Sequence, residues 1–108
     1  MTDNDREVIV KAIKKTKREY IIIVHGTDTM DKTAHYITKE KINKKIILTG
    51  AMVPYSVNPI ESTFNLGSAF GYLQNTQKGG VYISMNGIIK DYKRVVKNKE
   101  KGYFEKSK

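Results

Sequence analysis

The sequence predicts an α/β fold in which an open parallel sheet is flanked by helices. Three short apolar runs lie at residues 20–24, 45–49 and 80–85, and each follows a segment whose apolar residues recur at helical spacing. Strands that alternate with helices are joined by crossovers, which make the strands parallel and cover the sheet. The 108 residues contain no internal repeat and no low-complexity linker, so we expect a single domain over residues 1–108.

The first helix is expected to begin near residues 2–4 and to end around Lys17. Asn4 and Glu7 have the spacing of a capping box. Four apolar residues then form the stripe that such a helix would bury: Val8, Ile9, Ala12 and Ile13. The next run, Tyr20–Val24, is apolar on both faces, which is typical of a strand inside a sheet that helices cover on both sides.

The second half of the pattern repeats this alternation. A helix is expected over about Met30–Glu40, then a strand over Lys45–Thr49, and then a loop over residues 51–60 that contains both prolines, Pro54 and Pro59. A third helix is expected over about Glu61–Gln74, with one apolar face made by Leu66, Ala69, Phe70 and Leu73. Gly67 and Gly71 weaken this helix, which suggests that another element packs closely against it.

The chain then returns to the sheet and ends in a basic tail. Gly80–Met85 is the third expected strand, Asn86 and Gly87 predict a tight turn, and the residues from Lys90 onward are rich in lysine.

The composition excludes several classes of protein. The chain has no cysteine, so it forms neither disulfides nor thiolate metal sites, and a reducing compartment suits it. No apolar run approaches the ~20 residues that cross a bilayer, and residues 1–20 do not resemble a signal peptide, so we expect a cytoplasmic protein without a membrane partner. His25 and His35 have no third partner at metal-ligand spacing, and no phosphate-binding glycine motif occurs, so we expect neither a metal nor a cofactor.

The net charge of +9 raises the possibility of a nucleic-acid partner, which we do not favour. The excess comes almost entirely from lysine, in a chain that is also rich in isoleucine and asparagine. These residues have A/T-rich codons, so a biased genome produces the same charge. Phosphate recognition favours the bidentate guanidinium, and only Arg6, Arg18 and Arg94 are present.

Candidate site residues follow the first two strands. Ligands bind beyond the carboxyl ends of strands in open α/β sheets, so Thr27, Thr49 and Met85 should lie at one edge. The segment His25–Thr29 follows the first strand and offers hydroxyls and a carboxylate. One interpretation is that these residues only cap the helix that begins near Met30, because Thr and Asp caps are common.

The other interpretation is a catalytic set. A threonine hydroxyl becomes a nucleophile when a nearby lysine of lowered pKa takes its proton and a carboxylate orients the pair. Thr27, Asp28 and a lysine from the tail could form such a set, although spacing alone does not select the lysine.

Four motifs, in order, resemble those of the bacterial L-asparaginase family. The segment His25-Gly26-Thr27-Asp28-Thr29-Met30 is similar to the family's HGTDTM motif, and the similarity extends through Thr33-Ala34. It continues in residues 48–54 (LTGAMVP), 64–66 (FNL) and 80–87, where Gly80-Val81 and Met85-Asn86-Gly87 match. Residues 95–99 (VVKNK) and 102–105 (GYFE) resemble the short, single-domain asparaginase-like proteins.

The resemblance implies a function and a set of site residues. The family hydrolyses the side-chain amide of L-asparagine, and sometimes of L-glutamine, through a threonine acyl-enzyme. By resemblance, Thr27, Asp28 and Lys97 are the catalytic Thr-Asp-Lys set, while Asp28, Gly26 and Ala51 contact the substrate. A small shift of the alignment would replace Lys97 by one of its neighbours Lys93, Lys99 or Lys101.

The sequence departs from the family pattern in two places. Glu61 stands where relatives have Asp, which we expect to disturb the preceding loop. Relatives begin with a strand that ends in a TGGTI motif, whose first threonine is the main nucleophile, and a further segment supplies a serine for the substrate carboxylate. Neither segment is recognisable in the 108 residues, so the resemblance implies an N-terminally truncated domain.

Two expectations follow from the missing segments. The isolated chain should be inactive, or should be a remnant or a fragment that needs an N-terminal partner piece. Loss of a strand should also leave the edge of Tyr20–Val24 exposed, which favours association into a homo-oligomer.

Overall fold

The computed structural model describes residues 1–53, 56–75, 79–98 and 100–107. Pro54 and Lys99, which the sequence analysis named, lie outside the described residues.

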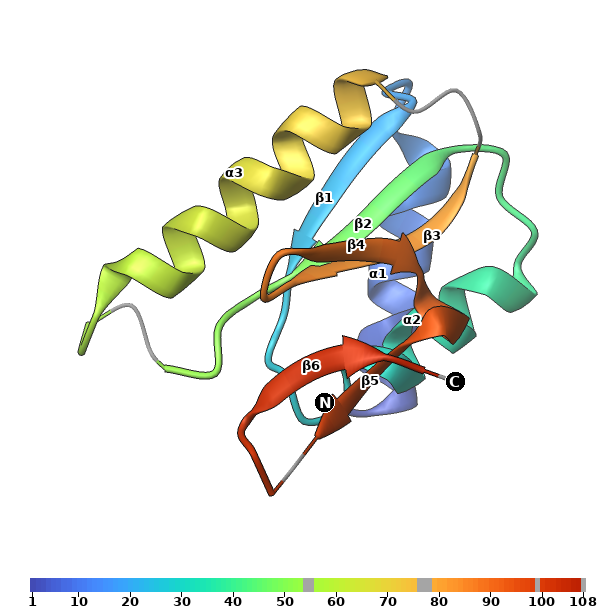
Figure 1. The fold of residues 1–108 in the computed structure, drawn as a ribbon. Coiled ribbons are helices and arrows are strands. Elements are labelled where there is room, and N and C mark those ends of the chain that lie inside the picture. Colours follow the sequence, from blue (N-terminus) through green and yellow to red (C-terminus); the bar gives the residue numbers. More distant parts are fainter. Residues whose placement is uncertain (54–55, 76–78, 99, 108) are drawn as a thin grey trace.

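A four-stranded sheet forms the centre of the molecule (Figure 1). Strands β1 (Tyr20–Val24), β2 (Lys45–Thr49) and β3 (Gly80–Met85) are parallel neighbours, and β4 (Ile88–Asp91) pairs with β3 in the antiparallel direction. The predicted bounds of the three apolar strands are confirmed. Val24 pairs with Thr49 and Thr49 with Ser84, so the three carboxyl ends lie side by side at one edge, as predicted.

Helices cover both faces of this sheet, which confirms the predicted α/β fold (Figure 1). Helices α1 (Asp3–Lys15) and α2 (Met30–Lys39) pack on one face, and α3 (Pro59–Asn75) packs on the other. Alternate residues of a strand point to opposite faces. Accordingly, Ile46 and Leu48 of β2 join the core beneath α1 and α2, while Ile47 joins Ala69, Leu73 and Tyr82 beneath α3.

Helix α1 begins within the predicted range, but its N-cap lies two residues before the predicted one. Thr2 is the N-cap residue: its hydroxyl accepts a hydrogen bond from the backbone N–H of Asp5, whose carboxylate in turn accepts from the backbone N–H of Thr2. The capping box predicted for Asn4 and Glu7 is therefore wrong by two residues.

The buried stripe of α1 is also shifted. Val8 is 68% exposed, whereas Arg6, Val10 and Ile13 are buried. The prediction is half correct: Ile13 is buried and Ile9 packs against the core, but Val8 and Ala12 are exposed.

Helix α3 begins at Pro59, inside the predicted loop, where proline is well suited to the first turn. The Ile60 N–H donates to the Asn58 side chain at 3.0 Å, which caps this end. The predicted buried face is only half correct. Ala69 and Leu73 are buried, but Leu66 is 42% and Phe70 is 60% exposed, and Asn65 is buried with them instead.

Strand β1 lies at the end of the sheet in the described part of the chain. Tyr20 is 49% and Val24 is 71% exposed, so the apolar edge expected for this strand is confirmed.

The basic tail folds back onto the sheet. After the turn at Asn86 and Gly87, where φ is 52° and 78°, the chain forms β4 and a single turn of 3-10 helix, η1 (Tyr92–Arg94). Strands β5 (Val95–Asn98) and β6 (Tyr103–Lys106) then pair as an antiparallel hairpin in a sheet of their own. The sequence predicts the turn but none of these later elements.

Candidate active site

The segment between β1 and α2 holds the first two candidate residues. Thr29 occupies the N-cap position of α2, but its side chain makes no capping hydrogen bond. The interpretation that these polar residues serve mainly to cap the helix therefore has no support at Thr29. Thr27 and Asp28 lie at the carboxyl end of β1, which is the edge where ligands bind in α/β sheets.

Lys97 reaches this segment from the C-terminal hairpin. Its Nζ atom donates hydrogen bonds to Thr27 Oγ1 at 3.0 Å and to Asp28 Oδ1 at 2.8 Å. The Lys97 side chain is only 16% exposed, whereas the Asp28 side chain is 94% exposed. One ammonium group thus joins a hydroxyl and a carboxylate that lie 70 and 69 residues away along the chain.

A chain of hydrogen bonds explains how Lys97 is held there. The buried Asn65 of α3 accepts from the Asn86 N–H at 3.0 Å, and Asn86 Oδ1 accepts from the Phe104 N–H at 2.7 Å. Phe104 of β6 is the strand partner of Lys97 in β5. Asn65 therefore holds the β3–β4 turn, the turn holds β6, and β6 positions the strand that contains Lys97.

A second set of hydrogen bonds holds the start of the segment between β1 and α2. Arg6 is 6% exposed, and its Nε donates to Thr33 Oγ1 at 2.9 Å. Thr33 Oγ1 lies 2.8 Å from His25 Nε2, and His25 Nδ1 lies 2.5 Å from the Gly26 carbonyl oxygen. The network is satisfied when Thr33 donates to Nε2 and a neutral imidazole donates from Nδ1. It fixes the carbonyl of the residue that precedes Thr27.

Glycine is required where the ends of β1 and β2 meet. A Cβ atom on Gly50 would lie 2.2 Å from the His25 carbonyl oxygen, which is backbone and cannot move alone. The His25 N–H also donates to the Thr49 carbonyl at 2.8 Å. The two strand ends are therefore in close contact directly beside the candidate residues.

Thr27, Asp28 and Lys97 line one small cavity of about 240 Å³ with the nearby Lys32, Val96 and Phe104. The other two predicted substrate-binding residues do not line it. Gly26 precedes Thr27 and is exposed, while Ala51 is half-buried just beyond β2. The structure therefore groups the three predicted catalytic residues but does not group Gly26 and Ala51 with them in this cavity.

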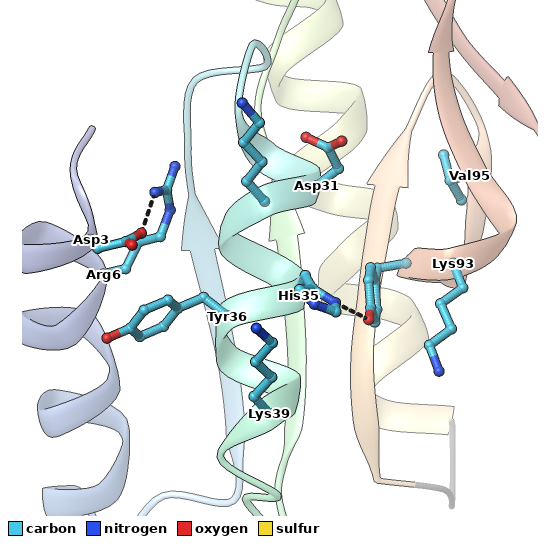
Figure 2. Close-up of a pocket in the computed structure, with 10 residues that line it drawn as sticks. Asp3, Arg6, Asp31, His35, Tyr36, Lys39, Lys93 and Val95 are labelled. Carbon is cyan, nitrogen blue, oxygen red and sulfur yellow. Dashed lines mark hydrogen bonds and ion pairs between the residues drawn. The ribbon is translucent and has the colours of Figure 1, made fainter.

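A larger cavity, of about 510 Å³, adjoins the small one and shares Asp31, Lys32 and Val95 with it (Figure 2). It opens between α1, α2 and η1, where His35 Nδ1 lies 3.0 Å from the Tyr92 hydroxyl and Arg6 pairs with Asp3 at 2.9 Å. Its size does not make it the better candidate, because neither Thr27 nor Lys97 reaches it. Among the described residues, no group of three or more His, Cys, Asp or Glu side chains could hold a metal ion.

The Glu61 carboxylate, whose extra methylene was expected to disturb the preceding loop, bonds two residues at the start of that loop. It accepts from the backbone N–H groups of Met52 at 3.0 Å and Val53 at 2.8 Å. It therefore holds the segment that follows Ala51.

Sequence reasoning missed four residues that support this site: Arg6, Thr33, Asn65 and Asn86. Three of them carried a signal. Thr33 stands in the similarity that follows the HGTDTM motif, Asn65 in the FNL motif and Asn86 in the predicted turn, but none of these patterns reveals what the side chain bonds.

Comparisons with known proteins agree with the motif resemblance. The model of the family described as "Asparaginase, N-terminal" matches residues 1–104. L-asparaginase 2 of Escherichia coli is 31% identical over 102 residues, which are 90% of this chain and 29% of that protein. Glutaminase-asparaginase of Pseudomonas fluorescens is 34% identical over 80 residues, which are 71% of this chain and 22% of that protein.

A solved structure gives the same result. The probable cytoplasmic L-asparaginase of Campylobacter jejuni superposes with a TM-score of 0.71 at 29% identity, over 90% of this chain and 33% of that one. The chain therefore spans about a quarter to a third of the length of these relatives. No helix in the described part of the chain combines the length and the apolar character needed to cross a membrane.

Proposed function

The chain belongs to the asparaginase family, over its N-terminal domain, and on this premise we propose that Thr27, Asp28 and Lys97 form the proton-transferring part of a site that hydrolyses L-asparagine. One observation supports this most strongly: the Lys97 ammonium contacts the Thr27 hydroxyl and the Asp28 carboxylate at the same time.

The geometry suits proton transfer during amide hydrolysis. Because Thr27 Oγ1 accepts from Lys97, its own proton can be directed toward a bound substrate. When the C–N bond of the amide breaks, the leaving nitrogen takes this proton and the Lys97 ammonium replaces it, so ammonia leaves without a free amide anion. Asp28 keeps the ammonium in place while the proton moves.

The covalent step needs a nucleophile in addition to these groups. A threonine hydroxyl attacks the amide carbon, and the proton that it loses restores the Lys97 ammonium, which gave up a proton toward the leaving nitrogen. Ammonia leaves, and water then hydrolyses the resulting ester to release L-aspartate and the free threonine. The family places that threonine in a TGGTI motif, which does not occur in the 108 residues. We therefore assign Thr27 to proton transfer and expect the 108 residues by themselves to release no ammonia.

The substrate is proposed from the site and from the names of the relatives. The exposed Asp28 carboxylate is within reach of a solute and suits the α-ammonium of an amino acid. Two Pseudomonas relatives are called glutaminase-asparaginase, so L-glutamine is the second substrate to test.

The compartment stays a proposal. One relative is called a probable cytoplasmic and another, from Haemophilus influenzae, a probable periplasmic L-asparaginase. We propose the cytoplasm, which is the compartment in the name of the Campylobacter jejuni relative.

The test compares three lysine variants in a chain extended by an N-terminal segment that contains a TGGTI motif. Lys97→Met should lower the rate of ammonia release from L-asparagine by about 100-fold or more, as expected for loss of a positioned proton donor. Lys93→Met and Lys101→Met are matched controls from the same tail and should have little effect. Equal losses in the three variants would contradict the assignment of Lys97.

The unextended chain provides the second arm. Turnover by the 108 residues alone that Thr27→Ala abolishes would overturn the proposal and make Thr27 the nucleophile. An extended chain that folds but shows no turnover would favour the alternative, a catalytically inactive remnant.

A further inference from the structure

The larger cavity between α1, α2 and η1 takes no part in the proposed hydrolysis. One side of α2 forms a wall of it, with Asp31, Lys32, His35, Tyr36 and Lys39. At 100° per residue, these positions span about 140° of the helix circumference. Figure 2 shows His35 and Lys39 projecting from successive turns of this wall. The volume of about 510 Å³ lies within the range of small-molecule sites.

Lys32 and Lys39 are placed to hold one anion together. They lie about 10 Å apart along α2 and within about 20° of each other around its axis. Because lysine side chains are long and flexible, both ammonium groups can reach a point between the two positions. Neither lysine forms a hydrogen bond or an ion pair within the described part of the chain. An anion would therefore bind without displacing a protein partner.

His35 adds a hydrogen-bond donor between the two lysines. Its Nδ1 atom lies 3.0 Å from the hydroxyl of Tyr92, which is only 9% exposed. When this hydroxyl donates to Nδ1, the neutral imidazole carries its hydrogen on Nε2. No hydrogen bond joins Nε2 to another of the described residues. Nε2 can therefore donate to an anion in the cavity.

The acidic residues of the cavity leave the positive charge of this wall largely uncompensated. Asp3 is paired with Arg6 at 2.9 Å. Asp31 lies about 12 Å from Lys39 along α2 and also lines the smaller cavity, so it stands at the catalytic end. The net charge of +9 adds a long-range attraction for anions.

We propose that the larger cavity binds a phosphate group through Lys32, His35 and Lys39, and that the ligand is a small phosphorylated metabolite. A phosphate monoester presents three strong acceptor oxygens, which match three convergent donors, and lysine binds phosphate as a point charge. A phosphate ion alone would leave most of the cavity unfilled. The half-buried Tyr36 lines the remaining space and offers an aromatic ring to the rest of the ligand.

The test is isothermal titration calorimetry of the 108-residue chain with inorganic phosphate and with adenosine monophosphate, at constant ionic strength. Ligand concentrations up to about 10 mM cover millimolar dissociation constants. Adenosine monophosphate should bind at least about threefold more tightly than inorganic phosphate, because its base contacts the Tyr36 ring. Equal affinities would overturn the metabolite as the ligand and assign the site to free phosphate.

Two double variants change the net charge by the same amount. Lys32→Gln/Lys39→Gln removes both ammonium groups from the wall and should weaken the binding of adenosine monophosphate by at least about tenfold. Lys11→Gln/Lys17→Gln removes two exposed lysines outside the cavity and should change the dissociation constant by less than about twofold. All four positions are exposed, so both variants should fold.

Nuclear magnetic resonance locates the bound anion. The backbone amide signals of His35 and Lys39 should shift as adenosine monophosphate is added. Shifts that concentrate at Thr27 and Lys97 instead would overturn the proposal, because they would place the anion in the smaller cavity. Equal losses of affinity in the two double variants would also overturn it, since they would show non-specific attraction to a basic chain. A parent chain that binds neither ligand, while circular dichroism shows it to be folded, would have the same consequence.

Discussion

Asn65→Ala should lower the free energy of unfolding more than most single substitutions that remove only a few atoms. The Asn65 side chain is 1% exposed and lies between α3 and the ends of two strands. Its Nδ2 donates to the Gly50 carbonyl at 2.8 Å, and its Oδ1 accepts from the Asn86 N–H at 3.0 Å. Alanine can make neither bond.

The magnitude follows from the groups that lose their partner. The Gly50 carbonyl belongs to a buried residue, so leaving it unpaired costs about 1–3 kcal/mol. The Asn86 N–H is nearer to solvent, so its loss costs about 0.5–1.5 kcal/mol. We expect the free energy of unfolding to fall by about 1.5–4.5 kcal/mol in total, which is a large part of the stability of a small domain.

The assay is urea unfolding followed by circular dichroism, with Asn75→Ala as the matched control. Asn75 ends the same helix, is exposed, and bonds only the Gly71 carbonyl at 2.7 Å among the bonds described. Its substitution should change the free energy of unfolding by no more than about 0.5 kcal/mol. Equal effects of the two substitutions would refute the reasoning.

A second measurement tests the connection to the site. Asn86 accepts from the Phe104 N–H, and Phe104 pairs with Lys97. In Asn65→Ala the Phe104 amide should therefore exchange its hydrogen faster than in Asn75→Ala. Unchanged exchange would show that the hairpin holds Lys97 without the help of Asn65.

Two further predictions concern the backbone at Gly50 and the cap of α1. Gly50→Ala should destabilise the fold by about 1–3 kcal/mol or more, because the new Cβ atom meets the His25 carbonyl at 2.2 Å. In thermal unfolding, Gly71→Ala should instead stabilise the fold. A change of stability in the same direction in both variants would contradict this prediction. The hydrogen bond from the Thr2 N–H, followed by that from the Thr2 hydroxyl, lowers the pKa of Asp5 below its ordinary value of 3.8. The folded pKa is the lower one, so the stabilisation is present above pH 3.8 and disappears as the pH falls through the folded pKa. Asp5→Asn should therefore reduce stability at about pH 6 and have progressively less effect as the solution is acidified, and a difference that is independent of pH would argue against the capping box.

The sequence by itself determined the strands and the edge at which the candidate site lies. The runs 20–24, 45–49 and 80–85 are β-branched and continuously apolar, and a parallel strand covered on both faces requires this pattern locally. Their parallel order followed from the alternation with helices. The position of Thr27 and Asp28 at a strand end also followed, because it depends only on where the first strand stops.

The orientation of the helices was decided by tertiary structure. Helix α3 is apolar around most of its circumference, so its sequence does not specify which side meets the sheet, and Asn65 is buried while Phe70 is exposed. Helix α1 buries Arg6 because Thr33 of another helix offers a hydrogen-bond acceptor at 2.9 Å. A partner that comes from a distant part of the chain leaves no periodic signal in the local sequence.

The position of Lys97 was also decided by tertiary structure. The tail contains several lysines, and their spacing in the sequence does not distinguish one from another. Lys97 reaches Thr27 and Asp28 because the Asn86 turn, the bond to Phe104 and the β5–β6 hairpin return this part of the chain to the carboxyl end of β1. Local sequence identifies several lysines in the tail, but only contacts between segments about 70 residues apart decide which lysine meets the threonine.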